Sequence, residues 1–154
     1  MRSESKLSEQ KYITFSLGDE DYGVPVTQVL EIVRMENLIR VPHSIDYFLG
    51  MMDVRGQVIP IVDLKKKLHM DFLTEKPERA ILIETGGRKI GLAVDRVTHV
   101  KNFSTDTIDE GPPVLRGGSA RHVLGVGKTG DQFIVLITLE GLFTQEELAQ
   151  IFGA

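Results

Sequence analysis

An internal repeat limits the folds open to this chain more strongly than any other property of its sequence. The segment that begins at Lys11, KYITFSLGDEDYGVPVTQVLEIV, matches the segment that begins at Arg79, RAILIETGGRKIGLAVDRVTHV, with an offset of 68 residues and no gap. A second pair, LGMMDVRGQVIPIVDLKKKL from Leu49 and LGVGKTGDQFIVLITLEGLF from Leu124, matches with an offset of 75 residues. We therefore expect two related halves, with an insertion in the second half at GPPVLRGGSARH, residues 111–122, since glycine, proline and serine are typical of loops.

Several segments of the repeat have the pattern of short β-strands. In residues 12–17, Tyr, Thr and Ser alternate with Ile, Phe and Leu, which is the period of two of a half-buried strand. Residues 81–85 and 89–94 flank two glycines and predict a hairpin, because glycine readily adopts the positive φ of tight turns. The continuous apolar runs 58–62 and 133–137 have the length of buried strands.

Helical signals are few. Residues 26–33 could form one or two amphipathic turns, although their β-branched side chains disfavour a helix. At the end of the chain, Thr144 and Glu147 have the spacing of a capping box, and a short closing helix with Ile151 on its apolar face is expected to follow. Short strands with turn signals, repeated twice, predict an all-β fold of two small, closed or nearly closed barrels with a C-terminal helix.

The length of 154 residues fits one domain or two very small ones that share an interface. The repeat divides the chain into a flexible tail over residues 1–10, a first β-barrel over 11–68, a polar linker over 69–78, and a second β-barrel with the C-terminal helix over 79–154. The tail lacks the apolar core of a secretory signal, and no apolar run approaches the ~20 residues that span a bilayer.

Composition excludes several classes of function. The chain has no cysteine, so a disulfide framework, a thiolate zinc site and a cysteine nucleophile are all ruled out. Lysine and arginine number 18 against 22 aspartates and glutamates, and the basic residues are scattered, whereas nucleic-acid binding usually needs a basic stripe. The exception, the run of three lysines at 65–67, is interpreted as a solvated face.

Three aspartates and four histidines are the residues that could carry chemistry. The aspartates Asp53, Asp63 and Asp95 are isolated carboxylates at strand ends, which usually cap turns or face solvent, and Asp63 is expected to cap the DLKKKL turn. The histidines show neither the paired spacing nor the clustering of a zinc site; they are His43, His69, His99 and His122. GVGKTGDQF lacks the order of a phosphate-binding loop and is interpreted as a hairpin turn. The sequence predicts no catalytic centre, no metal site and no cofactor.

The segment GMMDVRGQVIPIVDLKKKL resembles the signature G-x-x-N-L-R-G-x-x-x-P-x-x-D-L of the CheW-like chemotaxis coupling proteins. The residues that match this signature in register are Gly50, Arg55, Gly56, Pro60, Asp63 and Leu64. The opening YITFSLGDEDYGVPVTQVLEI and the closing HVLGVGKTGDQFIVLITLEGLF are also similar to that family, so the resemblance covers the chain after its tail. Asp53 and Val54 replace the usual Asn-Leu pair, and an aspartate can accept a turn hydrogen bond much as asparagine does.

The resemblance implies two five-stranded, SH3-like β-barrels related by internal duplication, with no enzymatic activity. Proteins of this family join the histidine kinase CheA, through its CheW-like regulatory domain, to the cytoplasmic tips of chemoreceptors. The implied location is therefore cytoplasmic, with recruitment to membrane-associated receptor arrays. Nucleic acid and direct membrane insertion are not among the expected partners.

The resemblance also implies a docking surface. A receptor tip is a helical hairpin, and a groove between two barrels could receive a helix whose apolar anchors recur at helical spacing. The residues implied to line that groove are Val29, Glu31 and Ile32 from the first barrel and Ile81, Ile90, Leu92 and Val97 from the second. Arg55 is the strongest single candidate, because the arginine of the family's N-L-R-G motif is tied to coupling and a guanidinium can hold carboxylates in a fixed geometry.

Other interpretations of these residues stay open at this point. By residue type alone, Val29, Ile81 and Leu92 fit a buried core nearly as well as a groove. Glu31 also fits an ordinary solvated surface, and Arg55 also fits a role in tightening a turn.

Alternative functions also remain. One is a coupling protein of a non-flagellar chemosensory system, such as pilus motility or biofilm signalling. Another, from a different class, is a small β-barrel ligand-binding protein or enzyme, which would need a pocket with perturbed titratable groups, for example around Asp53 and Asp63. The chain could also be one module of a longer protein.

Overall fold

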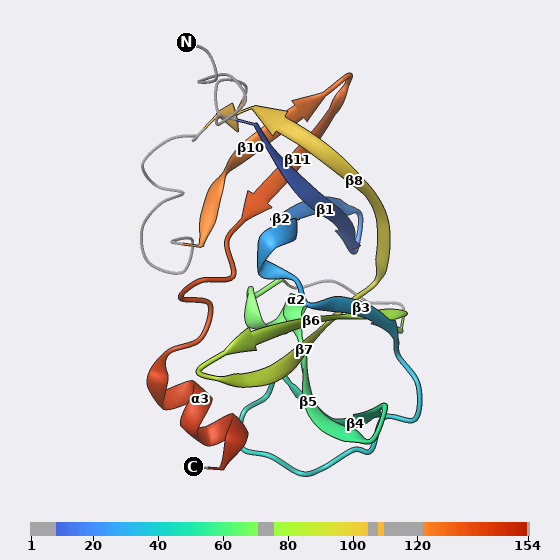
Figure 1. Ribbon diagram of the computed structural model, residues 1–154, viewed down its shortest axis with the longest axis vertical. Helices are drawn as coiled ribbons and strands as arrows, with labels where there is room; N and C mark the ends of the chain where they lie inside the picture. Colours follow the sequence, from blue (N-terminus) through green and yellow to red (C-terminus); the bar gives the residue numbers. More distant parts are fainter. Residues whose placement is uncertain (1–8, 71–75, 105–107, 110–121, 154) are drawn as a thin grey trace. The chain divides into compact units, whose positions relative to one another are not determined.

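The computed structural model describes residues 9–70, 76–104, 108–109 and 122–153. In these ranges the chain consists mainly of β-strands, with few helices and one of them at the C-terminal end (Figure 1). This confirms the predicted all-β class. The strands form two sheets, which is consistent with two barrel-like units.

The sheet of unit 1 has the strand order β8-β1-β2-β11-β10-β9. Its strands in chain order are β1 (Glu9–Leu17), β2 (Glu20–Pro25), β8 (Arg96–Ser104), β9 (Ile108–Asp109), β10 (Val123–Thr129) and β11 (Gln132–Ile137). β1 and β2 form one antiparallel hairpin, β10 and β11 form another, and a parallel pairing of β2 with β11 joins them. The two-residue β9 pairs with β10 and makes this sheet six-stranded, whereas five strands were expected.

The sheet of unit 2 has the strand order β3-β6-β7-β5-β4. Its strands in chain order are β3 (Glu31–Arg34), β4 (Phe48–Val54), β5 (Gln57–Asp63), β6 (Arg79–Thr85) and β7 (Arg88–Val94). Here too, two antiparallel hairpins, β4–β5 and β6–β7, are joined by a parallel pairing, in this case of β5 with β7. The predicted hairpin around the two glycines is therefore confirmed as β6–β7.

The two sheets are equivalent position by position, as the duplication predicts. In the parallel pairings, Gly23 lies opposite Leu136 in unit 1, and Gly91 lies opposite Ile61 in unit 2. The offset between the two glycines is the 68 residues of the first match, and the offset between their partners is the 75 residues of the second. A Cβ atom on Gly23 would lie 2.9 Å from Leu136, and one on Gly91 would lie 2.5 Å from Ile61, so both crossings need glycine for the same close approach.

Each unit takes its hairpins from both repeats of the sequence. Unit 1 is made from Met1–Gln28 and Val97–Leu142, and unit 2 from Val29–Arg96 and Phe143–Ala154. The expected boundaries, a first barrel over 11–68 and a second over 79–154, therefore do not separate the two units. The physical reason is the parallel pairing in each sheet, which joins the opening hairpin of one repeat to the closing hairpin of the other.

The cores are apolar, and β1 is covered on both faces. In unit 1, Tyr12 and Phe103 pack edge to face with ring centroids 5.7 Å apart, beside Ile134 and Leu136. The expected half-buried alternation of β1 is wrong, because all six residues from Tyr12 to Leu17 are buried. Its polar side chains have hydrogen-bond partners, since the Thr14 hydroxyl oxygen lies 2.7 Å from that of Thr98 and the Ser16 hydroxyl donates to Asp21 Oδ1 at 3.4 Å.

The core of unit 2 lies between its two hairpins. It is formed by Met52, Ile59, Ile61, Ala80, Leu82 and Ala93. Side chains that alternate with these along β6, such as Ile81 and Ile83, are also buried. The central strands of unit 2 are therefore covered on both faces and read as continuous apolar runs.

The helices are short. Residues 26–33, for which a helical turn was considered, form a 3-10 helix η1 (Val26–Gln28) followed by strand β3, as their β-branched content favours. Helix α2 (Leu64–Lys67) begins at Asp63, whose side chain accepts hydrogen bonds from the Lys65 and Lys66 amides, so the predicted cap is confirmed.

The C-terminal helix α3 (Gln145–Phe152) has the predicted capping box. The Thr144 hydroxyl accepts from the Glu147 amide at 3.0 Å, and the Glu147 carboxylate accepts from the Thr144 amide at 2.8 Å. Ile151 is buried on its apolar face, as expected. Gly153 ends the helix in the left-handed conformation.

Some predictions fall outside the described residues. These are the insertion at 111–122 except for its last residue, residues 71–75 of the linker, and residues 1–8 of the tail. Glu9 and Gln10, which were assigned to the tail, belong instead to strand β1.

Candidate protein-docking site

The β4–β5 hairpin carries the signature arginine at its tip. Val54 pairs with Gln57, so Arg55 and Gly56 are the two loop residues. Both have positive φ, 51° at Arg55 and 85° at Gly56, as the two-residue turn of a twisted hairpin requires. Asp53 accepts a hydrogen bond from the Gly56 amide at 2.8 Å, which confirms that aspartate acts as a turn acceptor here.

Arg55 and Glu31 form an ion pair on the surface of unit 2. Arg55 Nη2 donates to Glu31 Oε1, and the arginine side chain is 69% exposed against 34% for the glutamate. The hydrogen bond from Arg55 holds the pKa of Glu31 below its ordinary value, and the charges of Arg55 and Lys89 act in the same direction. The structure therefore brings together two of the residues that the family resemblance selected.

A shallow hollow of about 390 Å³ lies beside this ion pair. We call it the Arg55 hollow; its lining residues are Glu31, Ile32, Val33, Arg34, Glu36, Asn37, Met52, Asp53, Val54 and Arg55. It includes three of the predicted docking residues, Glu31, Ile32 and Arg55. Apolar side chains from β3 and β4 line it together with charged ones, a mixture that suits a protein contact.

The other predicted docking residues are placed differently. Val29 is half-buried in unit 2, two positions before Glu31, and Val97 is half-buried in β8. Ile81, Ile90 and Leu92 are buried, with no more than 1% of their surface exposed. These three side chains are core residues in this structure, because β6 and β7 are the covered central strands of their sheet.

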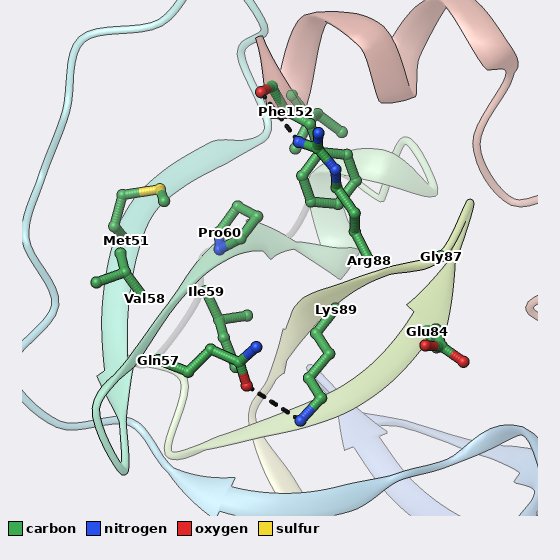
Figure 2. Close-up of a pocket in the computed structure, with 11 residues that line it drawn as sticks. Met51, Gln57, Val58, Ile59, Pro60, Glu84, Gly87, Arg88, Lys89 and Phe152 are labelled. Carbon is green, nitrogen blue, oxygen red and sulfur yellow. Dashed lines mark hydrogen bonds between the residues drawn. The ribbon is translucent and has the colours of Figure 1, made fainter. Parts of the chain in front are cut away.

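A second hollow of about 430 Å³ lies on the other side of the β4–β5 hairpin, toward helix α3 (Figure 2). Arg88 lies over the Phe152 ring, 5.2 Å from its centroid, and Lys89 Nζ donates to Gln57 Oε1 at 3.1 Å. Figure 2 shows Pro60 between Arg88 on one side and Met51 and Val58 on the other. This hollow was not predictable from the sequence, because periodicity alone does not reveal that Val58 is 58% exposed.

The lysine run at 65–67 is not simply a solvated face. Lys65 is buried and donates from Nζ to Asp95 Oδ1 at 2.6 Å, so one of the three candidate aspartates is the partner of a buried lysine. Lys66 is exposed, as expected for a solvated face. Lys67 is half-buried and contacts Glu147 of α3 at 3.3 Å. The sequence held no signal for these pairings, because the partners of Lys65 and Lys67 lie far away along the chain.

Among the described residues, no group of three or more His, Asp or Glu side chains is arranged to hold a metal ion. His43 instead contacts the main chain at both ring nitrogens: Nδ1 accepts from the Ile45 amide at 3.0 Å, and Nε2 lies 2.9 Å from the Gln150 carbonyl oxygen. Within the part of the chain that the structure describes, no helix has the length and apolar character needed to cross a membrane.

The chain is similar in sequence and structure to CheW proteins. The model of the CheW-like domain family matches residues 11–147. Chemotaxis protein CheW of Klebsiella aerogenes is 27% identical over 143 residues, which are 92% of this chain and 86% of that protein. The probable chemotaxis protein CheW of Rhizobium etli is 32% identical over 143 residues, 90% of each chain.

A solved structure agrees with these relatives. The crystal structure of the scaffolding protein TtCheW from Thermoanaerobacter tengcongensis superposes with a TM-score of 0.75, at 33% sequence identity and over 88% of each chain. The duplicated β-fold, the turn that presents Arg55 and the match over most of the chain agree with one another. This protein belongs to the CheW-like family of chemotaxis scaffold proteins.

Proposed function

We propose that this protein is a non-enzymatic adaptor that couples the cytoplasmic tips of chemoreceptors to the histidine kinase CheA in signalling arrays. Family membership and the scaffold name of a structural relative support this function. The structural observation that carries it is the exposed Arg55–Glu31 pair beside the Arg55 hollow. The protein acts in the cytoplasm and is recruited to the membrane-associated array through its partners.

Arg55 is well suited to recognise another protein. Its guanidinium remains mostly exposed while Glu31 fixes its direction, so donors are left to bind carboxylates or carbonyl oxygens of a partner. Preorganisation of this kind lowers the entropy lost on docking. Arginine is also among the residue types that most often dominate the energy of protein interfaces.

Two partners would use different parts of the surface. The family resemblance implies that the kinase regulatory domain is itself CheW-like. That domain docks at the Arg55 hollow, with one barrel against the other. The helical receptor tip docks on apolar anchors outside that hollow, of which Val29 in unit 2 retains exposed surface. Ile81, Ile90 and Leu92 are buried, and the proposed surfaces therefore do not include them.

A binding titration tests the kinase contact. The wild type and Arg55→Ala are titrated against a CheA regulatory-domain fragment, after circular dichroism has shown that both are folded. Truncation of a central interface arginine typically weakens binding by about tenfold or more, and we expect a loss of that size. Arg40→Ala, which removes another exposed arginine of unit 2 outside the hollow, is the matched control and should bind like the wild type.

Equal binding by wild type and Arg55→Ala would remove Arg55 from the interface. Failure of the wild type to bind the kinase fragment at all would contradict the proposed function itself.

A further inference from the structure

Arg55 occupies a backbone conformation that costs free energy for any residue with a side chain. Its φ of 51° lies in the left-handed region, which glycine adopts easily and an arginine does not. Such outliers persist where the surrounding structure holds them, and they concentrate at functional sites. Two questions follow: why an arginine occupies this position, and which contact stabilises its backbone conformation.

The duplication of the chain supplies an internal comparison. The β10–β11 hairpin of unit 1 is equivalent to β4–β5, and its turn lies between Thr129 and Gln132 as the other lies between Val54 and Gln57. Gly130, with φ of 60°, stands 75 positions after Arg55 and takes its place. The two turns differ at their second loop residue, because Gly56 has positive φ and Asp131 does not. At the first loop residue, however, the equivalent hairpin has glycine at no steric cost, so closing the hairpin does not require an arginine there.

The acceptor that stabilises the turn is also specific to the Arg55 hairpin. Asp53 accepts from the Gly56 amide at 2.8 Å, whereas the equivalent position in the other hairpin is Lys128, whose ammonium group has no acceptor oxygen. Asp53 is exposed, pairs across the strands with Val58 and also lines the Arg55 hollow. The hairpin with the strained arginine is thus the one that has a side-chain acceptor for its turn.

We infer that Asp53 is a positioning residue of the docking site: by accepting the Gly56 amide it holds Arg55 in the left-handed conformation from which the guanidinium reaches Glu31 and faces the partner. The inference rests on the proposed function, and it assigns Asp53 a role that acts through Arg55. Without the acceptor, the turn samples conformations in which Arg55 is not bound to Glu31. Binding must then order Arg55 again, and the conformational entropy lost in doing so weakens the affinity.

Three variants separate the hydrogen bond from the charge. Asp53→Ala removes both, Asp53→Asn keeps an acceptor oxygen and removes the charge, and Lys128→Ala changes the equivalent position of the other hairpin as a matched control. In titrations with the CheA regulatory-domain fragment we expect Asp53→Ala to bind about fivefold more weakly, the factor that one hydrogen bond typically contributes. Asp53→Asn should bind within about twofold of the wild type, and Lys128→Ala should be unchanged.

A double-variant cycle tests whether Asp53 acts through Arg55. Once Arg55 is alanine, a further Asp53→Ala substitution should cause no additional loss of binding. An equal loss in both backgrounds, or wild-type affinity for Asp53→Ala alone, would overturn the inference.

A measurement without a partner tests the positioning role of Asp53 separately from the proposed function. Amide hydrogen exchange at Gly56 and the NMR signals of the Arg55 guanidinium report the turn and the ion pair directly. Both should change in Asp53→Ala and stay close to wild type in Asp53→Asn. If the wild type binds no kinase fragment, the proposed function fails, while an unchanged Gly56 amide and Arg55 signal in Asp53→Ala would separately refute the positioning role.

Discussion

Two ion pairs of unit 2 show how the environment of a charge decides its role. The Arg55–Glu31 pair is exposed, so water and salt screen it and it contributes little to stability. The Lys65–Asp95 pair is buried, with side chains only 2% and 8% exposed. A buried pair costs solvation when it forms, but it costs far more when one partner is removed and the other stays behind as an unpaired charge. The exposed pair is therefore accessible to a partner protein, and the buried pair supports the fold of unit 2.

The buried pair gives a stability prediction. Lys65→Met keeps most of the apolar stem of the side chain but leaves Asp95 without its cation, and we expect it to lower the free energy of unfolding by about 3–5 kcal/mol. Urea denaturation followed by circular dichroism measures this loss. The double variant Lys65→Met with Asp95→Asn should recover part of it, because no charge is then left unpaired. A single variant as stable as the wild type would show that the pair does not support the fold.

Local side-chain contacts were predictable from sequence, and distant ones were not. The cap by Asp63 and the capping box of Thr144 and Glu147 join residues two or three positions apart, so spacing alone predicts them. The bond between Lys65 and Asp95 joins residues 30 positions apart. Arg55 and Glu31 are 24 positions apart, and only family resemblance placed both in the site.

Among the elements, helix α3 is held against the rest of unit 2 by polar contacts as well as by the buried Ile151. Glu147 accepts from the Tyr47 hydroxyl at 2.6 Å and pairs with Lys67 at 3.3 Å. Burial alone would raise the pKa of Glu147, but the hydrogen bonds from Tyr47 and the Thr144 amide, together with Lys67, outweigh burial and lower it. Burial and the hydrogen bond to Glu147 raise the pKa of Tyr47, so its hydroxyl stays protonated as a donor. The charged form of Glu147 is therefore the form that holds the helix.

The attachment of α3 should depend on pH. The lowered pKa of Glu147 means that its contribution to stability is present above the ordinary carboxyl value of 4.5 and is lost as pH falls through the lowered value. Glu147→Gln retains an acceptor for the capping box but has no charge. We expect it to melt about 2–4 °C below the wild type at neutral pH, with a smaller difference in acid. Thermal unfolding of both proteins across this range measures the effect, and a difference independent of pH would exclude the charge as its source.

At the scale of the whole molecule, the chain builds two equivalent units from interleaved segments. The sequence repeat revealed the equivalence, because Gly23 and Gly91 or Leu136 and Ile61 hold matching places. The exchange of hairpins between the repeats was not predictable. The offset between two matched segments shows that they are alike, but it does not show which strands pair in a sheet. Parallel pairing of strands from distant segments is decided by packing.

The exchange predicts how fragments behave. A fragment of residues 1–70 holds the β1–β2 hairpin of one sheet and strands β3, β4 and β5 of the other, so it lacks four strands of the first sheet and two of the second. The fragment of residues 76–154 lacks the complementary strands. We expect neither fragment to unfold cooperatively alone and expect their mixture to regain a folded complex. Circular dichroism and size-exclusion chromatography measure this, and a fragment that folds by itself would contradict the interleaved arrangement.

In the proposed function, one molecule of this protein holds a kinase and a receptor together. A bridging experiment measures this: a CheA regulatory-domain fragment is passed over an immobilised chemoreceptor signalling-tip fragment with and without this protein. We expect the kinase fragment to be retained only when the protein is present, and we expect Arg55→Ala to reduce its retention. Retention of the kinase fragment to the same extent without the protein, or none with it, would contradict the proposed function.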